Sequence, residues 1–204
     1  MRYICKANEP EKFAKWKALA NSDWQPTYND LSGEIKAEVF CSLLKEQGNI
    51  CCYCERELVD GDYHIEHLNP QSAHVGDDLN YANFLCSCLN KTARGDPLHC
   101  GKLKGSDYIE VHPLLVNCSS EFSFVASGEI TGRTEPAQRT IATLGLDINK
   151  LTSMRKTALE PFLDDAIEGD DFLKFVQNYL TPSEMGHLNP FQSMITEIFT
   201  PNAK

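Results

Sequence analysis

The sequence predicts an α+β protein in which a small, cysteine-rich ββα module is embedded in a mainly helical chain. Six of the nine cysteines fall between positions 51 and 100. Apolar residues recur at helical spacing on both sides of that stretch, whereas the stretch itself holds only short strand-like runs separated by turn residues. We therefore expect a helical region over 1–49, the cysteine-rich core over 50–105, and a hairpin with further helices over 106–204.

The expected elements of the core are two strands and one helix. Residues 52–59 and 63–68 are predicted as strands joined by a turn at 60–62, and residues 78–85 as a helix. In the flanks, Gly48 is placed to end a helix. The expected flanking elements are helices over 9–20 and 32–47, a hairpin of 122–125 with 129–132, and helices from Pro136 onward, over 151–167, 171–179 and 190–199.

The composition is typical of a globular protein, with 42% hydrophobic and 24% charged residues. No apolar run approaches the roughly 20 residues that would span a bilayer, and the first residues lack the apolar segment of a secretory signal. We expect a cytoplasmic protein without a membrane partner. An odd number of cysteines in such a chain argues against a disulfide framework and points to metal binding.

The net charge of −10 is unusual for a protein that binds phosphate, but the charges are unevenly placed. Acidic residues dominate from position 159 onward. The basic residues between positions 88 and 105 are Lys91, Arg94, Lys102 and Lys104. Either one face of the molecule meets nucleic acid through these four residues, or the two charged regions are simply solvated surfaces of opposite sign.

The cysteines predict a structural zinc site. Cys51 and Cys54 form a CxxC pair, whose spacing allows both thiolates to bind one tetrahedral Zn²⁺. Cys88 and Cys100 are the preferred second pair, with Cys52 and Cys86 as competitors. The remaining three cysteines, Cys5, Cys41 and Cys118, are expected to be buried apolar thiols.

A second group of residues, His64 to Pro70, carries the chemistry of phosphodiester hydrolysis. A carboxylate such as Glu66 can hold Mg²⁺ or Mn²⁺, and a neutral imidazole such as His67 can take a proton from water. Since these two residues alternate on a strand, a strand end is needed to bring them together, and Pro70 supplies one. Asn83 is placed to hydrogen-bond the backbone near His67 and orient the imidazole.

These motifs together resemble the HNH endonuclease family. The resemblance extends to the HNH proteins of bacterial retrons and Septu-type antiphage systems, through Leu44 to Glu55, His64-Ile65-Glu66-His67, His99-Cys100-Gly101 and Thr140 to Asp147. It implies a ββα-metal fold with structural zinc. By matching position, it also implies that Glu66 binds the catalytic cation, that His67 is the general base and that Asn83 orients His67.

The final cation ligand of the family pattern is not evident, because Lys102 stands where relatives often have histidine. Asn90 or His99 could replace it, and His64 could act as a ligand or as a partner of Glu66. Lys102 and Lys104 could instead contact phosphate.

We therefore expect a metal-dependent HNH endonuclease with structural Zn²⁺ and catalytic Mg²⁺ or Mn²⁺. The resemblance implies the effector of an antiphage system that works with an ATPase and, in retrons, with a reverse transcriptase and its RNA–DNA product. The alternatives are a non-catalytic zinc adaptor that docks a partner through the acidic helical tail, and a free-standing restriction or repair nuclease.

Overall fold

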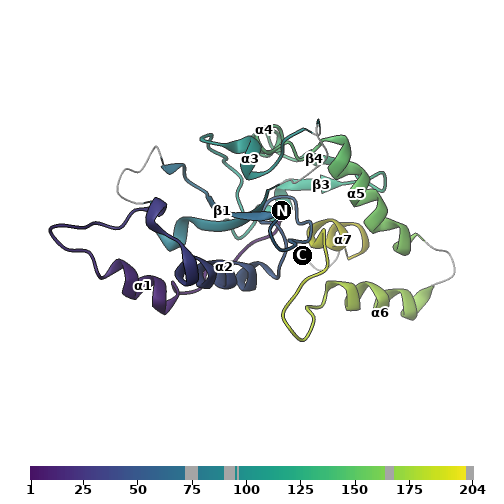
Figure 1. The fold of residues 1–204 in the computed structure, drawn as a ribbon. Helices are drawn as coiled ribbons and strands as arrows, with labels where there is room; N and C mark the ends of the chain where they lie inside the picture. Colours follow the sequence, from purple (N-terminus) through teal and green to yellow (C-terminus); the bar gives the residue numbers. More distant parts are fainter. Residues whose placement is uncertain (72–77, 90–94, 96, 164–167, 201–204) are drawn as a thin grey trace.

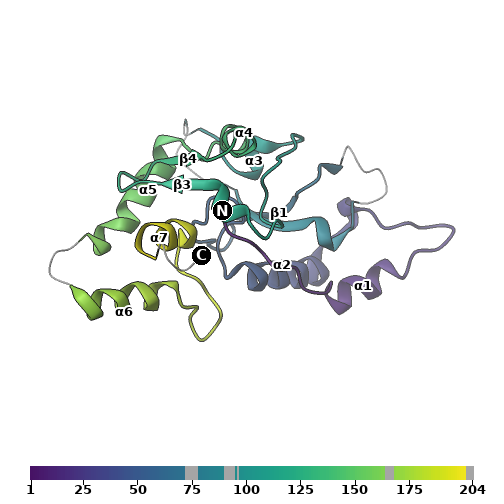
Figure 2. The same ribbon diagram turned by 180° about the vertical axis from the view of Figure 1, so that it is seen from behind.

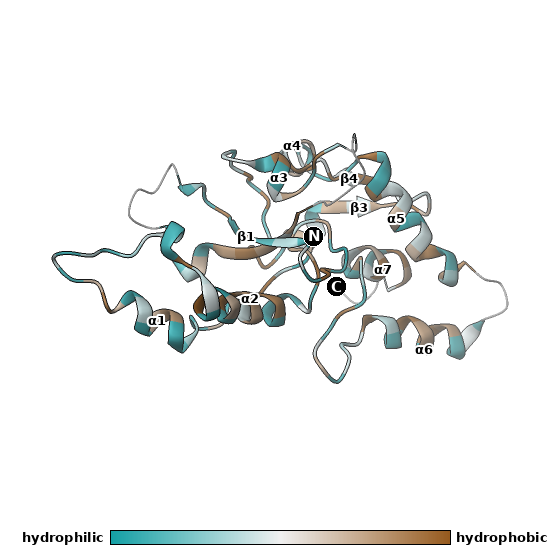
Figure 3. Ribbon diagram, viewed as in Figure 1, coloured by the Kyte–Doolittle hydropathy of each residue, from teal (hydrophilic) through white to brown (hydrophobic). Residues whose placement is uncertain are grey.

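The computed structural model describes residues 1–71, 78–89, 95, 97–163 and 168–200. Figures 1 and 2 show an elongated arrangement with α1 (Glu11–Lys17) at one end, and with α5 (Asn149–Leu159) and α6 (Gly169–Leu180) at the other. Small antiparallel sheets lie between the two ends. This mixture of helices and small sheets confirms the α+β class. Buried residues from all three expected regions form one hydrophobic core, and Figure 3 shows hydrophobic residues on α2 near the centre.

Helix α2 (Gly33–Gln47) supports the cysteine-rich core from one side. Val39 and Leu43 are four positions apart on one face and both are fully buried. The helix ends at Gly48, which has the left-handed φ of 64° that favours glycine at this position. The buried Gln47 amide then exchanges hydrogen bonds with the backbone of Cys86, which fixes the end of α2 against the middle of β2 (Phe84–Cys88).

The central sheet pairs β1 (Tyr63–His67) antiparallel with β2, so that Glu66 lies opposite Leu85 and His64 opposite Ser87. All five residues of β2 are buried. A short helix, α3 (Gly101–Lys104), follows after the segment 89–100. The order of elements in the core is therefore strand, strand, short helix.

Two predictions within the core are wrong. Residues 52–54 form a turn rather than part of a strand. The β-structure in the segment 50–57 is one isolated antiparallel bridge between Ile50 and Glu57. The segment expected as a helix over 78–85 is a single 3₁₀ turn, Tyr81–Asn83, followed by β2. Phe84 to Cys88 is a short apolar run buried on both faces, and such a run has no periodicity that separates a strand from a helix.

The C-terminal region forms the expected hairpin and helices. Strands β3 (Phe122–Phe124) and β4 (Ile130–Gly132) pair antiparallel, β4 contacts α4 (Glu135–Leu144), and β3 contacts α7 (Gln192–Phe199). Helix α5 ends earlier than expected, at Leu159. A 3₁₀ turn, Glu160–Phe162, follows, because Pro161 has no N–H with which to continue the α-helix. The remainder of that prediction, residues 164–167, lies outside the described residues. No described helix is long and apolar enough to cross a membrane.

Candidate metal centres and active site

Four cysteines from three segments converge on one point. Cys51 and Cys54 flank the turn after α2, Cys88 ends β2, and Cys100 precedes α3. Their Sγ atoms all lie within 4.8 Å of one another, and all four residues are buried. Cys54 Sγ and Cys88 Sγ are 3.9 Å apart. Four sulfurs at about 2.3 Å from a tetrahedral Zn²⁺ would be about 3.8 Å apart, so this cluster fits the ion.

The surroundings favour thiolates at two of the four cysteines. Hydrogen bonds from neighbouring cysteines outweigh burial and lower the pKa of Cys51, and a hydrogen bond from Cys100 lowers the pKa of Cys88 to about 6, whereas burial raises the pKa of Cys54 and Cys100. The ring of His99, which is fully buried, lies with Nδ1 3.1 Å from Cys100 Sγ and 3.8 Å from Cys88 Sγ. Arg56 adds a positive charge beside Cys88. These groups offset the negative charge that four thiolates bring to a zinc site.

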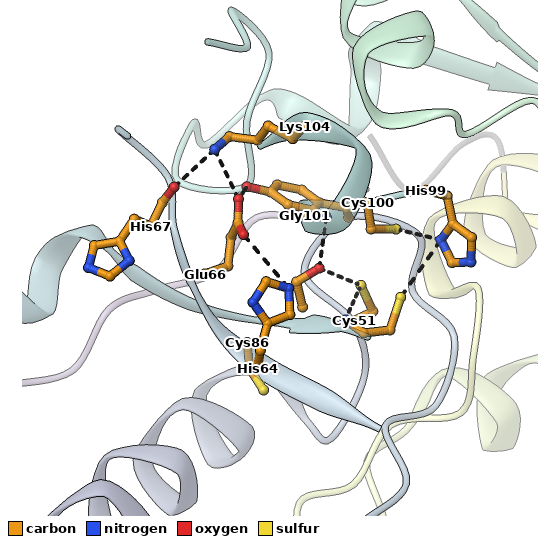
Figure 4. Close-up of polar contacts among 12 residues, drawn as sticks. Cys51, His64, Glu66, His67, Cys86, His99, Cys100, Gly101 and Lys104 are labelled. Atoms are coloured by element: carbon orange, nitrogen blue, oxygen red, sulfur yellow. Dashed lines mark hydrogen bonds and ion pairs between the residues drawn. The ribbon is translucent and has the colours of Figure 1, made fainter. Parts of the chain in front are cut away.

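The other cysteines lie outside this cluster. Cys86 was the nearest competitor of Cys88, but in Figure 4 its sulfur points away from Cys51 and Cys100. Neither Cys52 nor Cys86 belongs to the group of four described cysteines whose Sγ atoms lie within 4.8 Å of one another. The expectation of buried thiols holds for Cys118 and is wrong for Cys5 and Cys41, which are exposed. Cys41 stands two positions after Val39 and so leaves the buried face of α2.

Glu66 and His64 project from the same face of β1, as alternate strand residues do. The Glu66 carboxylate is buried, and its Oε1 accepts hydrogen bonds from the Tyr53 hydroxyl at 3.1 Å and the Lys104 ammonium at 3.0 Å. Its Oε2 lies 3.8 Å from His64 Nε2 (Figure 4). Two donors that share a cation at about 2.1 Å each are at most about 4.2 Å apart, so this pair can bind one ion.

Two further observations support a cation between these atoms. His64 Nε2 is buried and has no hydrogen-bond partner among the described residues. A Cβ added to Gly101 would lie 2.9 Å from His64 Nε2 and would clash with Glu66 Oε2, so the missing side chain leaves open the space that both atoms face. Burial lowers the pKa of His64, which favours the neutral imidazole that binds metals.

The His67 ring is held edge-on between Tyr28 and Phe84, with centroid distances of 4.7 and 4.8 Å. Its Nε2 lies 2.9 Å from the Asp78 carbonyl oxygen, which can only accept, and 3.3 Å from the Gln71 amide nitrogen; the shorter contact assigns the proton to Nε2. Nδ1 is then the unprotonated nitrogen. Burial lowers the pKa of His67 and keeps the ring neutral near pH 7. His67 lines the same open hollow as His64 and Glu66.

Asn83 holds the backbone that follows His67. Its Oδ1 accepts from the Asn69 N–H at 2.8 Å, and its Nδ2 donates to the Asn69 carbonyl oxygen at 2.9 Å. The Asn83 carbonyl also accepts from the N–H of Leu68. Asn83 therefore makes the backbone contacts near His67 that its position in the sequence suggested.

The structure places the remaining candidate residues in different surroundings. Lys104 was expected to contact phosphate from a surface loop, but its side chain is 1% exposed and bonds to Glu66 and to the His67 carbonyl oxygen. Lys102, on the other side of α3, is exposed. His99 lies against the cysteines rather than beside Glu66. Asn90, Lys91 and Arg94 lie outside the described residues.

Sequence reasoning overlooked the contribution of Tyr53 and Gly101 to the surroundings of Glu66. Tyr53 stands inside the CxxC motif, and Gly101 follows the last zinc-site cysteine. Their adjacency to the motifs was visible, but nothing in the sequence indicated that both approach the carboxylate of Glu66.

Comparisons with known proteins agree with the motifs. No protein-family model matches the chain. The chain is 27% identical over 162 residues to a protein of Vibrio cholerae serotype O1 biovar El Tor named "Retron Vc95 putative HNH endonuclease". This similarity covers 74% of the chain and 78% of that protein. The resemblance to retron-associated HNH endonucleases that the motifs predicted is confirmed by this relative.

Proposed function

We propose that this protein is a metal-dependent HNH endonuclease that hydrolyses phosphodiester bonds in nucleic acid. The observation that carries the proposal is the shared hollow of His64, Glu66 and His67, in which a pair of cation donors lies beside an imidazole whose Nδ1 is unprotonated. A zinc adaptor has no need of such a buried donor pair, so this geometry favours the enzyme.

Each residue has a distinct part in the proposed mechanism. Glu66 and His64 hold a divalent cation, which, when bound, offsets negative charge on the scissile phosphate. Nδ1 of His67 takes the proton from the attacking water, while the hydrogen bond of its Nε2 to Asp78 fixes the tautomer. Asn83 holds the backbone after His67 in place. The four cysteines hold structural Zn²⁺, which fixes the segments around β1 and β2.

His67→Ala tests the mechanism, with His187→Ala as the matched control because His187 is exposed and lies outside the hollow. The purified protein, alone and with proteins that co-purify, is incubated with plasmid DNA, single-stranded DNA and RNA, with Mg²⁺, Mn²⁺ or EDTA. We expect His67→Ala to lower the cleavage rate by about 10²- to 10⁴-fold, the usual contribution of a general base. Cleavage by His67→Ala at the parental rate would refute the assignment.

The biological setting is a further part of the proposal. The Vibrio cholerae relative is named for a retron, and we propose that this chain is likewise the cytoplasmic effector nuclease of an antiphage system of retron or Septu type. Its partners would be an ATPase and, in a retron, a reverse transcriptase with its RNA–DNA product. Lys91, Arg94 and Lys102 would contact nucleic acid. Co-purification from the native host tests this setting, because a free-standing nuclease would recover no ATPase.

A further inference from the structure

The two oxygens of the Glu66 carboxylate lie in different surroundings. Oε1 accepts from Tyr53 and Lys104, at 3.1 and 3.0 Å. Oε2 faces His64 Nε2 across the space left by Gly101. Tyr53 and Lys104 are each 1% exposed, so water does not compete for their hydrogen bonds to Oε1. One oxygen is therefore held by the protein, and the other is left for a ligand.

Both donors belong to segments that the zinc-site cysteines anchor. Tyr53 lies between Cys51 and Cys54, and Lys104 lies on α3, directly after Cys100. The Ser87 hydroxyl strengthens this connection, because it accepts from the Gly101 N–H at 3.1 Å and lies 3.8 Å from Cys51 Sγ (Figure 4). The positions of the four sulfurs thus determine where the two donors stand.

We propose that Tyr53 and Lys104 are positioning residues, which fix Oε1 of Glu66 so that Oε2 and His64 Nε2 hold the divalent cation in a preset geometry. This inference rests on the proposed cation site at Glu66. Lys104 also donates to the His67 carbonyl oxygen at 3.0 Å. One ammonium group therefore links the cation ligand to the backbone of the proposed general base.

Lys104 could also have the opposite effect on cation binding, by competing with the cation for the Glu66 carboxylate. An ammonium group beside a carboxylate repels an arriving cation, and its removal would then strengthen cation binding. Positioning predicts the reverse, since a carboxylate without fixed hydrogen bonds can rotate away from the cation. Loss of such outer partners typically weakens metal binding by about 10- to 100-fold. The sign of the change in affinity separates the two effects.

The test measures Mn²⁺ binding by calorimetry on the full-length, zinc-loaded protein. Lys104→Met is compared with Lys174→Met, which removes the same charge from a 72% exposed side chain on α6. Tyr53→Phe removes only the hydroxyl. We expect the Mn²⁺ dissociation constant to rise about 10- to 100-fold in Lys104→Met and about tenfold in Tyr53→Phe. Lys174→Met should stay within about threefold of the parent, because an exposed charge is screened. Zinc content and circular dichroism verify the fold.

Binding as tight as the parent, or tighter, in Lys104→Met and Tyr53→Phe would overturn the inference. The proposed function would still stand if the parent binds Mn²⁺ and Glu66→Gln does not. A parent protein that binds no Mn²⁺ would overturn both. If Lys104→Met fails to fold, Tyr53→Phe decides the question alone, since it keeps the buried ring.

Discussion

Gly101→Ala fills the space between the two proposed cation donors with a single methyl group. The new Cβ would lie 2.9 Å from both Glu66 Cδ and His64 Nε2. Since the optimal separation of non-bonded heavy atoms is about 3.5 Å, His64 must move by roughly 0.6 Å, and Glu66, whose Oε2 is closer still, by at least as much. Metal sites tolerate departures of about 0.2 Å in ligand distance, so the displacement is about three times what the cation site can accept.

The same substitution should affect the fold only slightly. Gly101 does not have a left-handed φ, and alanine is favoured over glycine within a helix by about 1 kcal/mol. Overpacking costs about 1–3 kcal/mol, and the gain in helix propensity offsets that cost in part. We therefore expect a change of roughly 2 kcal/mol or less in the free energy of unfolding, together with an unchanged zinc content. Cleavage should fall by about 100-fold or more, as a displacement of this size at a reacting centre produces.

The assay combines Mn²⁺-dependent cleavage with zinc analysis and thermal unfolding. Leu103→Ala is the control, because Leu103 lies on the same helix and is 41% exposed. Near-parental cleavage and Mn²⁺ affinity in Gly101→Ala, with the fold intact, would show that the cation does not bind between Glu66 and His64. Loss of zinc in Gly101→Ala alone would place the damage at the cysteines instead.

Three further predictions follow from the site. Burial lowers the pKa of His67 below its ordinary value of 6.5. The cleavage rate should therefore be independent of pH around neutrality and fall about tenfold per pH unit only below that lowered pKa. A rate that begins to fall above pH 7 as the pH is lowered would contradict His67 as the base. Cys88→Ser should lose the zinc while Cys86→Ser retains it, measured by metal analysis; equal zinc loss in both would refute the assignment of ligands. Asn83→Ala leaves the Asn69 N–H and carbonyl without their side-chain partner, so the free energy of unfolding should fall by about 1–3 kcal/mol. The cleavage rate at saturating Mn²⁺ should also fall. Unchanged stability and an unchanged rate would remove Asn83 from the site.

Spacing along the chain was sufficient to predict which four cysteines cluster and the strand β1. A CxxC pair with two distant cysteines indicates a tetrahedral site, because Zn²⁺ imposes both ligand type and number. Helix α2 was predictable because Val39 and Leu43 repeat at the helical period and Gly48 ends the helix. In contrast, the fully buried β2 has no alternation of polar and apolar residues, and the strand was not predicted: its first two residues were assigned to the expected helix over 78–85.

The sequence by itself determined which residue types are available: four thiols, a carboxylate beside an imidazole, and an asparagine to hold the following turn. Only the tertiary structure decided which atoms meet. Lys104 and Tyr53 converge on one oxygen of Glu66, and Gly101 opens the space beside the other. Such contacts join segments about 13 to 38 positions apart, measured from Tyr53 and Lys104 to Glu66. Local spacing records the geometry of one turn or strand, whereas contacts across segments depend on how the elements pack.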